Sequence, residues 1–403
     1  MQSVLILVGI IIGTAAYVAI SGMMLGFQVK LLDQLVNNDA NIRISAREDV
    51  LTPQKMDSFN TTEHVFWIIP PSGRKDSAKI EYPVAWFDKL NSDPDVVAYS
   101  PQVNMNVIFT RNKISYAGRI VGSVASKQIK VTNIDKYMID GNFKDIGNAG
   151  NTVIFGQGLL EKLGARVSET IKISSGTLQP HSFKIVGSFK TGIKSVDDTT
   201  AFASLTDVQK IREAGSTITD IAVKIADPYM SQTIAERWKI TTLDKVISWE
   251  ESSSGILSVF KTQDIVRNSM TIAIIVVASF GIYNILSILV NQKKRDIAIL
   301  RSMGYEPRDI VWIFLNQGLI LGIIGGLLGL LVGFIMCKII GSIEVDSNRM
   351  TGSNDGRMII SYNLIIYLKA ISIALGSSLL SSILPARFAG KMEPMDIIRS
   401  GGQ

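Results

Sequence analysis

The stretch from Val311 to Cys337 reads VWIFLNQGLILGIIGGLLGLLVGFIMC and contains no charged side chain. About 20 apolar helical residues cross a hydrocarbon core of about 30 Å, so this stretch is long enough to span a bilayer. Val4 to Phe27, Met270 to Val290 and Tyr362 to Leu384 have the same character, with Lys369 as their only charge. Lys369 lies near one end of its span, from which a lysine can reach the interface. The sequence therefore predicts four transmembrane helices.

The composition agrees with membrane spans beside a polar domain. The 403 residues are 47% hydrophobic, and the mean hydropathy is +0.27. The net charge of +6 does not indicate a nucleic-acid-binding protein, because many basic residues flank the apolar blocks. The chain has one cysteine, Cys337, and two histidines far apart, His64 and His181, so we expect neither a disulfide framework nor a metal site.

The basic residues predict the orientation. The first apolar stretch lacks a basic leader and exceeds the core of a signal peptide, so we interpret it as a retained helix. Cytoplasmic loops are enriched in lysine and arginine, which places the second loop and the C-terminal tail inside and the third loop outside. Residues 1–27 are then the first helix, 28–267 an extracytoplasmic domain and 268–403 a C-terminal transmembrane domain. The basic residues are Lys293, Lys294, Arg295, Arg301 and Arg308 in the second loop, and Arg387, Lys391 and Arg399 in the tail.

The predicted fold class is a four-helix membrane protein with a large α+β domain inserted between helices 1 and 2. Apolar alternation and turn residues in that domain predict short strands and helices. Residues 47–79 are mostly polar and are interpreted as a long loop or insertion. The expected strands lie at 40–46, 107–110, 151–155, 172–175, 183–189 and 218–225, and the expected helices at 158–163 and 204–213.

The residues offer little catalytic chemistry. Neither a phosphate-binding G-x-x-x-x-G-K-[ST] loop nor a G-x-S-x-G elbow is present. The pair Asp197-Asp198 is interpreted as a solvated turn, because adjacent carboxylates in a strand point to opposite faces. No acidic residue or histidine lies deep in a predicted span, which argues against an ion-driven transporter. We expect a non-enzymatic chain with no catalytic residues and no cofactor of its own.

A small-residue stripe marks the third span. Gly325, Gly329 and Gly333 recur every four residues and share one helix face, which another helix can approach closely. The sequence leaves open whether this face packs inside one subunit or between two.

Several motifs resemble one family. The segment from Gln292 to Gly304, QKKRDIAILRSMG, is similar to the loop after the second helix in permeases of the FtsX and MacB superfamily, and closest to the lipoprotein-releasing branch, LolC and LolE. The order of one span, a domain and three spans agrees along the whole chain. The shorter resemblances are Met24 to Phe27 (MLGF), Ala278 to Asn284 (ASFGIYN), Ile185 to Gly192 (IVGSFKTG) and Leu384 to Arg387 (LPAR).

This resemblance implies a permease of the bacterial inner membrane that releases lipoproteins by mechanotransmission. The implied partners are two copies of a cytoplasmic ABC ATPase, which hold ATP and Mg, a second permease subunit, identical or different, membrane lipid, lipoprotein cargo and a periplasmic carrier. Two alternatives stay open: MacB-like export of peptides or hydrophobic compounds, and FtsX-like regulation of a cell-wall hydrolase.

Two groups of residues are the candidate sites. A short helix at 304–312 would dock on the ATPase, with Tyr305 and Ile310 as apolar anchors beside Glu306, Arg308 and Asp309; the alternative is an ordinary charged turn. At the outer ends of spans one and two, adaptable apolar side chains would meet acyl chains, unless they only face lipid or pack. These side chains are Met23, Met24, Phe27, Val259 and Phe260.

Overall fold

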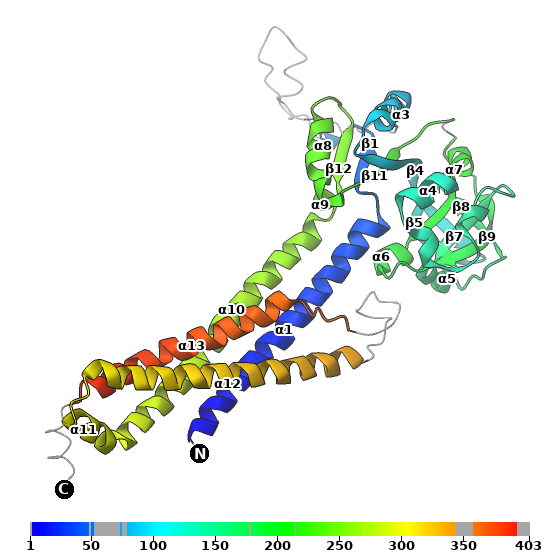
Figure 1. Cartoon of the computed structure of the whole chain (residues 1–403). Coiled ribbons are helices and arrows are strands. Elements are labelled where there is room, and N and C mark those ends of the chain that lie inside the picture. The colour runs from blue at the N-terminus through cyan, green and yellow to red at the C-terminus, as the bar shows by residue number, and fades with distance from the viewer. Residues whose placement is uncertain are drawn as a thin grey trace, which may run out of the picture. The chain divides into compact units, whose positions relative to one another are not determined.

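The structure is a computed structural model that describes residues 2–47, 50–51, 73–74, 79–176, 179–213, 215–343 and 358–392 (Figure 1). The chain divides into two compact units, which are described separately. The membrane unit runs to Leu31 and resumes at Ser258, and the external unit is Leu32–Leu257. Most of the insertion at 47–79 lies outside the described residues, apart from a pair of short antiparallel strands, β2 (Val50–Leu51) and β3 (Gly73–Arg74).

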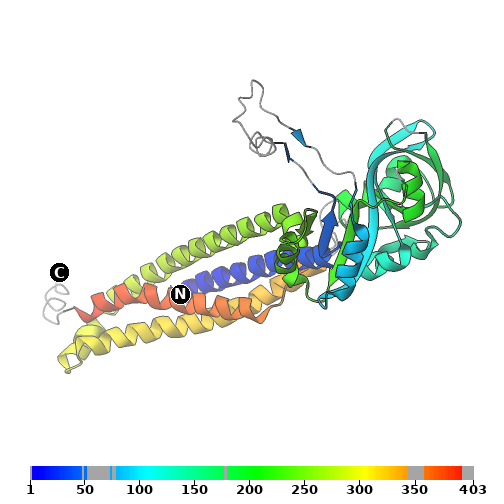
Figure 2. The ribbon, with the colours of Figure 1, turned by 90° about the horizontal axis from the view of Figure 1, so that it is seen from above.

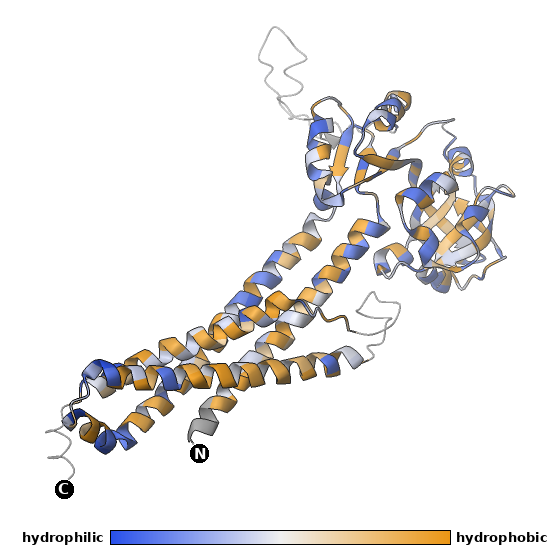
Figure 3. Ribbon diagram, in the orientation of Figure 1, coloured by the Kyte–Doolittle hydropathy of each residue, from blue (hydrophilic) through white to orange (hydrophobic). Residues whose placement is uncertain are grey.

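Four helices in the described residues are long and apolar enough to cross a membrane, and each contains one predicted span. They are α1 (Gln2–Asn38), α10 (Ser254–Gln292), α12 (Pro307–Ser342) and α13 (Leu364–Gly390). Figure 3 shows their largely hydrophobic colouring. Helices α1 and α10 run past the predicted boundaries at 28 and 267, because residues 28–38 and 256–267 contain no proline or glycine to stop them.

The external unit holds a ten-stranded sheet, whose strands are listed here in chain order. They are β1 (Ile42–Ser45), β4 (Val96–Arg111), β5 (Ile114–Ser123), β6 (Met138–Asp140), β7 (Thr152–Gly156), β8 (Thr170–Ser174), β9 (His181–Phe189), β10 (Thr200–Ser204), β11 (Asp220–Ile225) and β12 (Lys245–Ser248). The helices are α3 (Pro83–Ser92), α4 (Ala125–Val131), α5 (Gln157–Leu163), α6 (Lys194–Asp197), α7 (Leu205–Arg212), α8 (Ser231–Lys239) and α9 (Trp249–Ser252). Single 3₁₀ turns cover Ile134–Tyr137, Phe143–Asp145 and Pro228–Met230.

Six strands close on themselves into a barrel lobe. Strand β4 pairs with β5, β5 with β10, β10 with β7, β7 with β9, β9 with β8, and β8 returns to β4. Alternate side chains of β8 are buried, as expected for a closed sheet with one packed face. The interior is filled by fully buried aromatic and branched residues, including Phe109 and Phe155, whose ring centroids are 5.0 Å apart. Helices α5 and α7 contribute Leu159 and Val208 to the same core.

The other lobe is an open sheet with helices. The order β12-β1-β11-β4 continues into the barrel through the 16-residue β4, so both lobes share one strand. Trp86 of α3 and Trp238 of α8 meet edge-on in its core, with ring centroids 6.0 Å apart. Figure 2 shows the same elements from above.

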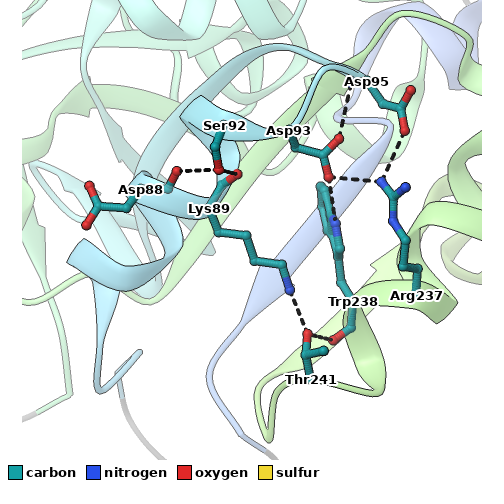
Figure 4. Close-up of polar contacts among 8 residues, drawn as sticks. All are labelled: Asp88, Lys89, Ser92, Asp93, Asp95, Arg237, Trp238 and Thr241. Carbon is teal, nitrogen blue, oxygen red and sulfur yellow. Dashed lines mark hydrogen bonds and ion pairs between the residues drawn. The ribbon is translucent and has the colours of Figure 1, made fainter.

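A polar network joins α3 to α8 beside that core (Figure 4). The partly buried Asp93 carboxylate accepts from Arg237 Nη2 at 2.9 Å, from Trp238 Nε1 at 3.1 Å and from the backbone N–H of Asp95 at 3.1 Å. Lys89 Nζ donates to Thr241 Oγ1 at 2.6 Å. Burial is the main cause that lowers the pKa of Lys89, with Asp93 opposing it. The network fixes the helix ends that the apolar core alone would leave free to shift.

The expected strands and helices of the external domain are confirmed in place, with two differences. The strand expected at 107–110 is part of the much longer β4. The sequence did not predict the strands β5, β6, β10 and β12 or the helices α3, α4, α6, α8 and α9. The interpretation of Asp197-Asp198 as a solvated turn is wrong for Asp197, which ends the short helix α6 and is buried. Its carboxylate accepts from Thr191 N at 2.8 Å, Thr191 Oγ1 at 2.7 Å and Gly192 N at 3.0 Å.

Candidate functional site

The segment between α10 and α12 forms a compact helical corner. Helix α11 (Lys294–Ser302) follows α10 after a single residue, and its apolar Ile297 is buried in the membrane unit. Gly304 has φ +101°, a conformation that side chains other than glycine rarely adopt, and it lets the chain turn. Helix α12 then starts at Pro307 with a reciprocal cap, in which Glu306 N donates to Asp309 Oδ2 at 2.9 Å. The helix expected at 304–312 is therefore not a separate element, because residues 307–312 are the start of α12. The separate short helix is α11, which lies earlier in the chain.

The two predicted apolar anchors, Tyr305 and Ile310, differ in solvent exposure. Tyr305 is 44% exposed, and Glu306, Arg308 and Asp309 are also exposed. Ile310 is only 1% exposed and packs in the interior of the membrane unit, so its side chain is not available to a partner. Ile310 is buried because it shares one face of α12 with Phe314, four residues later, and that face packs against the interior of the membrane unit.

Two exposed apolar residues beside Tyr305 were missed by the sequence reasoning. Ile299 is 52% exposed and Met303 is 66% exposed. Arg301 Nη1 donates to the Tyr305 carbonyl at 2.9 Å and so holds Tyr305 against α11. We call Ile299, Met303 and Tyr305 the corner patch. Apolar residues outside the inward stripe of a short amphipathic helix were the signal that could have found it.

At the outer ends of α1 and α10, the structure brings the predicted lipid-contact residues onto neighbouring helices. Gln28 Nε2 donates to Gln263 Oε1 and to Asp264 Oδ1, each at 3.3 Å, and ties the two helices together. The predicted contact residues near this bridge differ in solvent exposure. Phe27 and Val259 are exposed, Met23 and Met24 are partly buried, and Phe260 is buried.

The glycine stripe packs inside the subunit. An ideal Cβ on each of Gly325, Gly329 and Gly333 would press on α1, in register with residues that also recur every four positions. A second face of α12, made by Gly318, Gly322 and Gly326, meets the small residues of α13 in the same way. The contacts to α1 pair Gly325 with Ile10, Gly329 with Thr14 and Gly333 with Val18, and those to α13 pair Gly318 with Ser382, Gly322 with Ser378 and Gly326 with Ala374.

Two family models match most of the chain. Residues 3–239 match the MacB-like periplasmic core domain, and residues 268–394 match the FtsX-like permease C-terminal domain. The boundary between the two matches falls near the start of the second predicted span.

The matches to individual proteins have low sequence identity, but the first two cover nearly all of this chain. The chain is 24% identical to the lipoprotein-releasing system transmembrane protein LolC of Neisseria meningitidis over 97% of this chain and 92% of that protein. It is 22% identical to the macrolide export ATP-binding/permease protein MacB of Psychrobacter cryohalolentis, covering 99% of this chain and 57% of that protein. Among solved structures, the periplasmic region of MacB from Actinobacillus actinomycetemcomitans is 12% identical with a TM-score of 0.35, over 56% of this chain and 97% of that one.

Proposed function

We infer the role of this chain from its family: it belongs to the FtsX-like ABC transporter permeases that carry a MacB-like periplasmic core domain. Members of this family work with cytoplasmic ABC ATPases. We propose that the chain extracts lipoproteins from the outer face of the inner membrane, driven by two copies of a separate ATPase that hold ATP and Mg. A second permease subunit would complete the transporter.

The continuity of α1 and α10 carries this proposal. The 39 residues of α10 form one unbroken helix about 58 Å long, and the 37 residues of α1 one about 55 Å long. Both exceed the roughly 30 Å hydrocarbon core, so each can transmit movement from the membrane into the external domain. Because only one residue separates α10 from α11, a displacement of α11 by the ATPase would be transmitted directly to α10. This arrangement supports mechanical transmission rather than a channel.

The cargo assignment rests on the extent of the LolC likeness, which covers nearly all of both chains. Lipid-anchored cargo needs an apolar surface at the outer boundary of the bilayer. Phe27 and Val259 are exposed on the two helices that the Gln28 bridge holds together, and we propose that they lie at this boundary. We propose that these two, with the partly buried Met23 and Met24, contact the acyl chains.

Cargo release by the reconstituted transporter tests this assignment. Met23→Asp with Met24→Asp should reduce ATP-dependent release of an acylated lipoprotein several-fold, because charge is hostile to acyl chains. Met336→Asp, near the end of α12, is the matched control for inserting a charge at the membrane edge. Normal release by a stably inserted double variant would remove these residues from the cargo site.

We propose that the ATPase docks on the corner patch together with Glu306, Arg308 and Asp309. Met303→Asp and Tyr305→Asp should each weaken ATPase binding by about tenfold or more, since a buried charge without a partner costs at least about 1–3 kcal/mol. Tyr305→Phe should bind like the wild type. Co-purification at matched membrane levels measures the effect, and full binding by both Asp variants would place docking elsewhere.

Macrolide-type export is the second candidate, favoured by the match of residues 3–239 to the MacB-like periplasmic core. The same reconstituted transporter discriminates the two. ATP hydrolysis stimulated by a hydrophobic compound, with no release of acylated protein, would favour export. Stimulation by acylated protein, and not by the same protein without its lipid, would favour lipoprotein release.

A further inference from the structure

A pocket of about 570 Å³ lies inside the membrane unit, between α1, α10 and α13. Pockets of this size commonly hold small molecules. Its polar lining is unusual for a site among membrane helices. The polar lining residues include Tyr17, Ser21, Arg267, Asn268, Asn363 and Lys369.

The charge of the lining is positive. Arg267 and Lys369 both line the pocket, and no carboxylate does. Arg267 shares its charge with Asp264, one turn away on α10, through a 2.9 Å ion pair. Among the residues that the structure describes, no carboxylate lies within ion-pair distance of Lys369. Among the described residues, the pocket therefore has more positive than negative charge, which favours an anion.

A buried hydroxyl without a partner points to the same conclusion. Ser21 is 3% exposed and belongs to the pocket lining, and its buried Oγ makes no hydrogen bond with the residues that the structure describes. Serines in membrane helices usually donate to a backbone carbonyl one turn earlier, as Ser372 does to Leu368 at 2.9 Å. A buried polar atom is normally satisfied, so an unmatched donor on a residue of the pocket lining indicates a missing acceptor.

The start of α13 adds to the positive field. Asn363 caps this helix by accepting from Ile365 N at 2.9 Å, and its amide NH₂ is left as a donor. The N-terminal end of a 27-residue helix carries a partial positive charge. The pocket thus combines a helix start, two cations and a free hydroxyl.

The depth of the pocket identifies the anion. Arg267 directly precedes the uncharged run that begins at Asn268, and Lys369 is the sixth residue of α13, about 7.5 Å along the helix from Leu364. Both groups are thus near the outer boundary of the hydrocarbon, where phospholipid phosphates lie. Basic pockets between membrane helices bind such phosphate groups.

We propose that this pocket binds the phosphate of an outer-leaflet phospholipid. Lys369 and Arg267 neutralise the phosphodiester, and Ser21 donates to one of its oxygens. The apolar Ile366 and Ile373 line the pocket beside these groups, where the acyl chains leave the glycerol. A diacylglyceryl thioether, the anchor of lipid-modified proteins, lacks this negative charge, so the site is distinct from a cargo site.

Lipid titration of the purified full chain by native mass spectrometry tests the proposal. The probes are phosphatidylglycerol and a diacylglycerol with the same acyl chains, which differ only in the phosphate headgroup. The wild-type chain should bind phosphatidylglycerol about tenfold more tightly, as expected for one charge-assisted contact. Lys369→Met should remove most of that preference, and Ser21→Ala should reduce it about two- to threefold.

Lys338→Met is the matched control, because it removes a lysine near the end of α12 that does not line the pocket. It should keep the full preference. Replacing a membrane lysine by methionine lowers the cost of insertion, so a folding failure of Lys369→Met is not expected. Equal binding of the two lipids by the wild type, or equal losses in both Lys variants, would overturn the proposal. Displacement of the lipid by inorganic phosphate alone would overturn its assignment to a lipid.

Discussion

The membrane unit and the external unit bury opposite kinds of side chain. In α12, six of the nine buried residues are glycines, and the facing part of α13 buries mainly serine and alanine. The external unit instead buries its largest residues completely, among them Trp238, Phe109 and Phe155. Burial of apolar area stabilises a fold in water, but lipid tails are as apolar as leucine. Membrane helices therefore gain from close backbone approach, and the water-exposed domain gains from large side chains.

The largest expected effect is the loss of a large side chain in the barrel lobe. Phe155→Ala should destabilise the external unit by about 3–5 kcal/mol, because it removes a fully buried ring and leaves a cavity. Urea-dependent proteolysis of the full chain measures this change. The matched variant Phe280→Ala removes a 64% exposed ring of α10 and should change stability by less than about 1 kcal/mol. Similar losses from both would break the comparison.

Replacing glycine by alanine should destabilise the membrane unit at one position and stabilise it at another. A Cβ on Gly329 would lie 2.6 Å from Thr14 Cβ and 3.0 Å from the Ile11 carbonyl, so Gly329→Ala should cost about 1–3 kcal/mol. Nothing lies within 4 Å of such a Cβ on Gly281, and Gly281→Ala should stabilise its helix by about 0.5–1 kcal/mol. Unfolding in mixed detergent measures both. A neutral Gly329→Ala would show that close approach is not needed.

Substitutions in the polar network of the external unit should lower its free energy of unfolding by less than substitutions in its apolar core. Asp93→Ala should cost about 1–3 kcal/mol, because Arg237, Trp238 and the Asp95 N–H lose one shared acceptor. Asp95→Ala removes only a half-exposed partner of Arg237 and should cost under about 1 kcal/mol. Thermal unfolding of the two variants gives the ranking, and the reverse order would contradict it.

The smallest effect concerns pH. Burial raises the pKa of Asp197, although three hydrogen bonds from Thr191 and Gly192 oppose the shift. The folded state therefore binds this proton more tightly than the unfolded chain, and the stability it contributes is lost as pH rises through the raised pKa. Compared with Asp197→Asn, the wild type should become relatively less stable as pH rises above the usual aspartate range. A stability difference between the two that does not vary with pH would exclude the shift.

The sequence predicted the elements whose signals are local. The apolar spans, the helix expected at 204–213 and the alternation in β8 and β9 depend on residues close in the chain, and the structure has helices and strands at these places. The candidate sites were predicted less well. Tyr305 is exposed as expected, but Ile310 and Phe260 are buried, because exposure depends on which face of a helix meets its neighbours. Phe27 and Val259 are exposed, and their contact with acyl chains is a proposal.

By itself, the amino-acid sequence predicted four spans, and the structure has four helices long and apolar enough to cross a membrane in the part of the chain that it describes. The orientation of the spans stays a prediction from loop charge. Hydrophobic length and loop charge are properties of single segments, and the bilayer acts on each segment separately. Only the tertiary structure decided that the glycine stripe packs against α1 within the subunit, and that Arg267, Lys369 and Ser21 line one pocket. These groups come from three helices far apart in the chain, and no local pattern specifies which faces of packed helices meet.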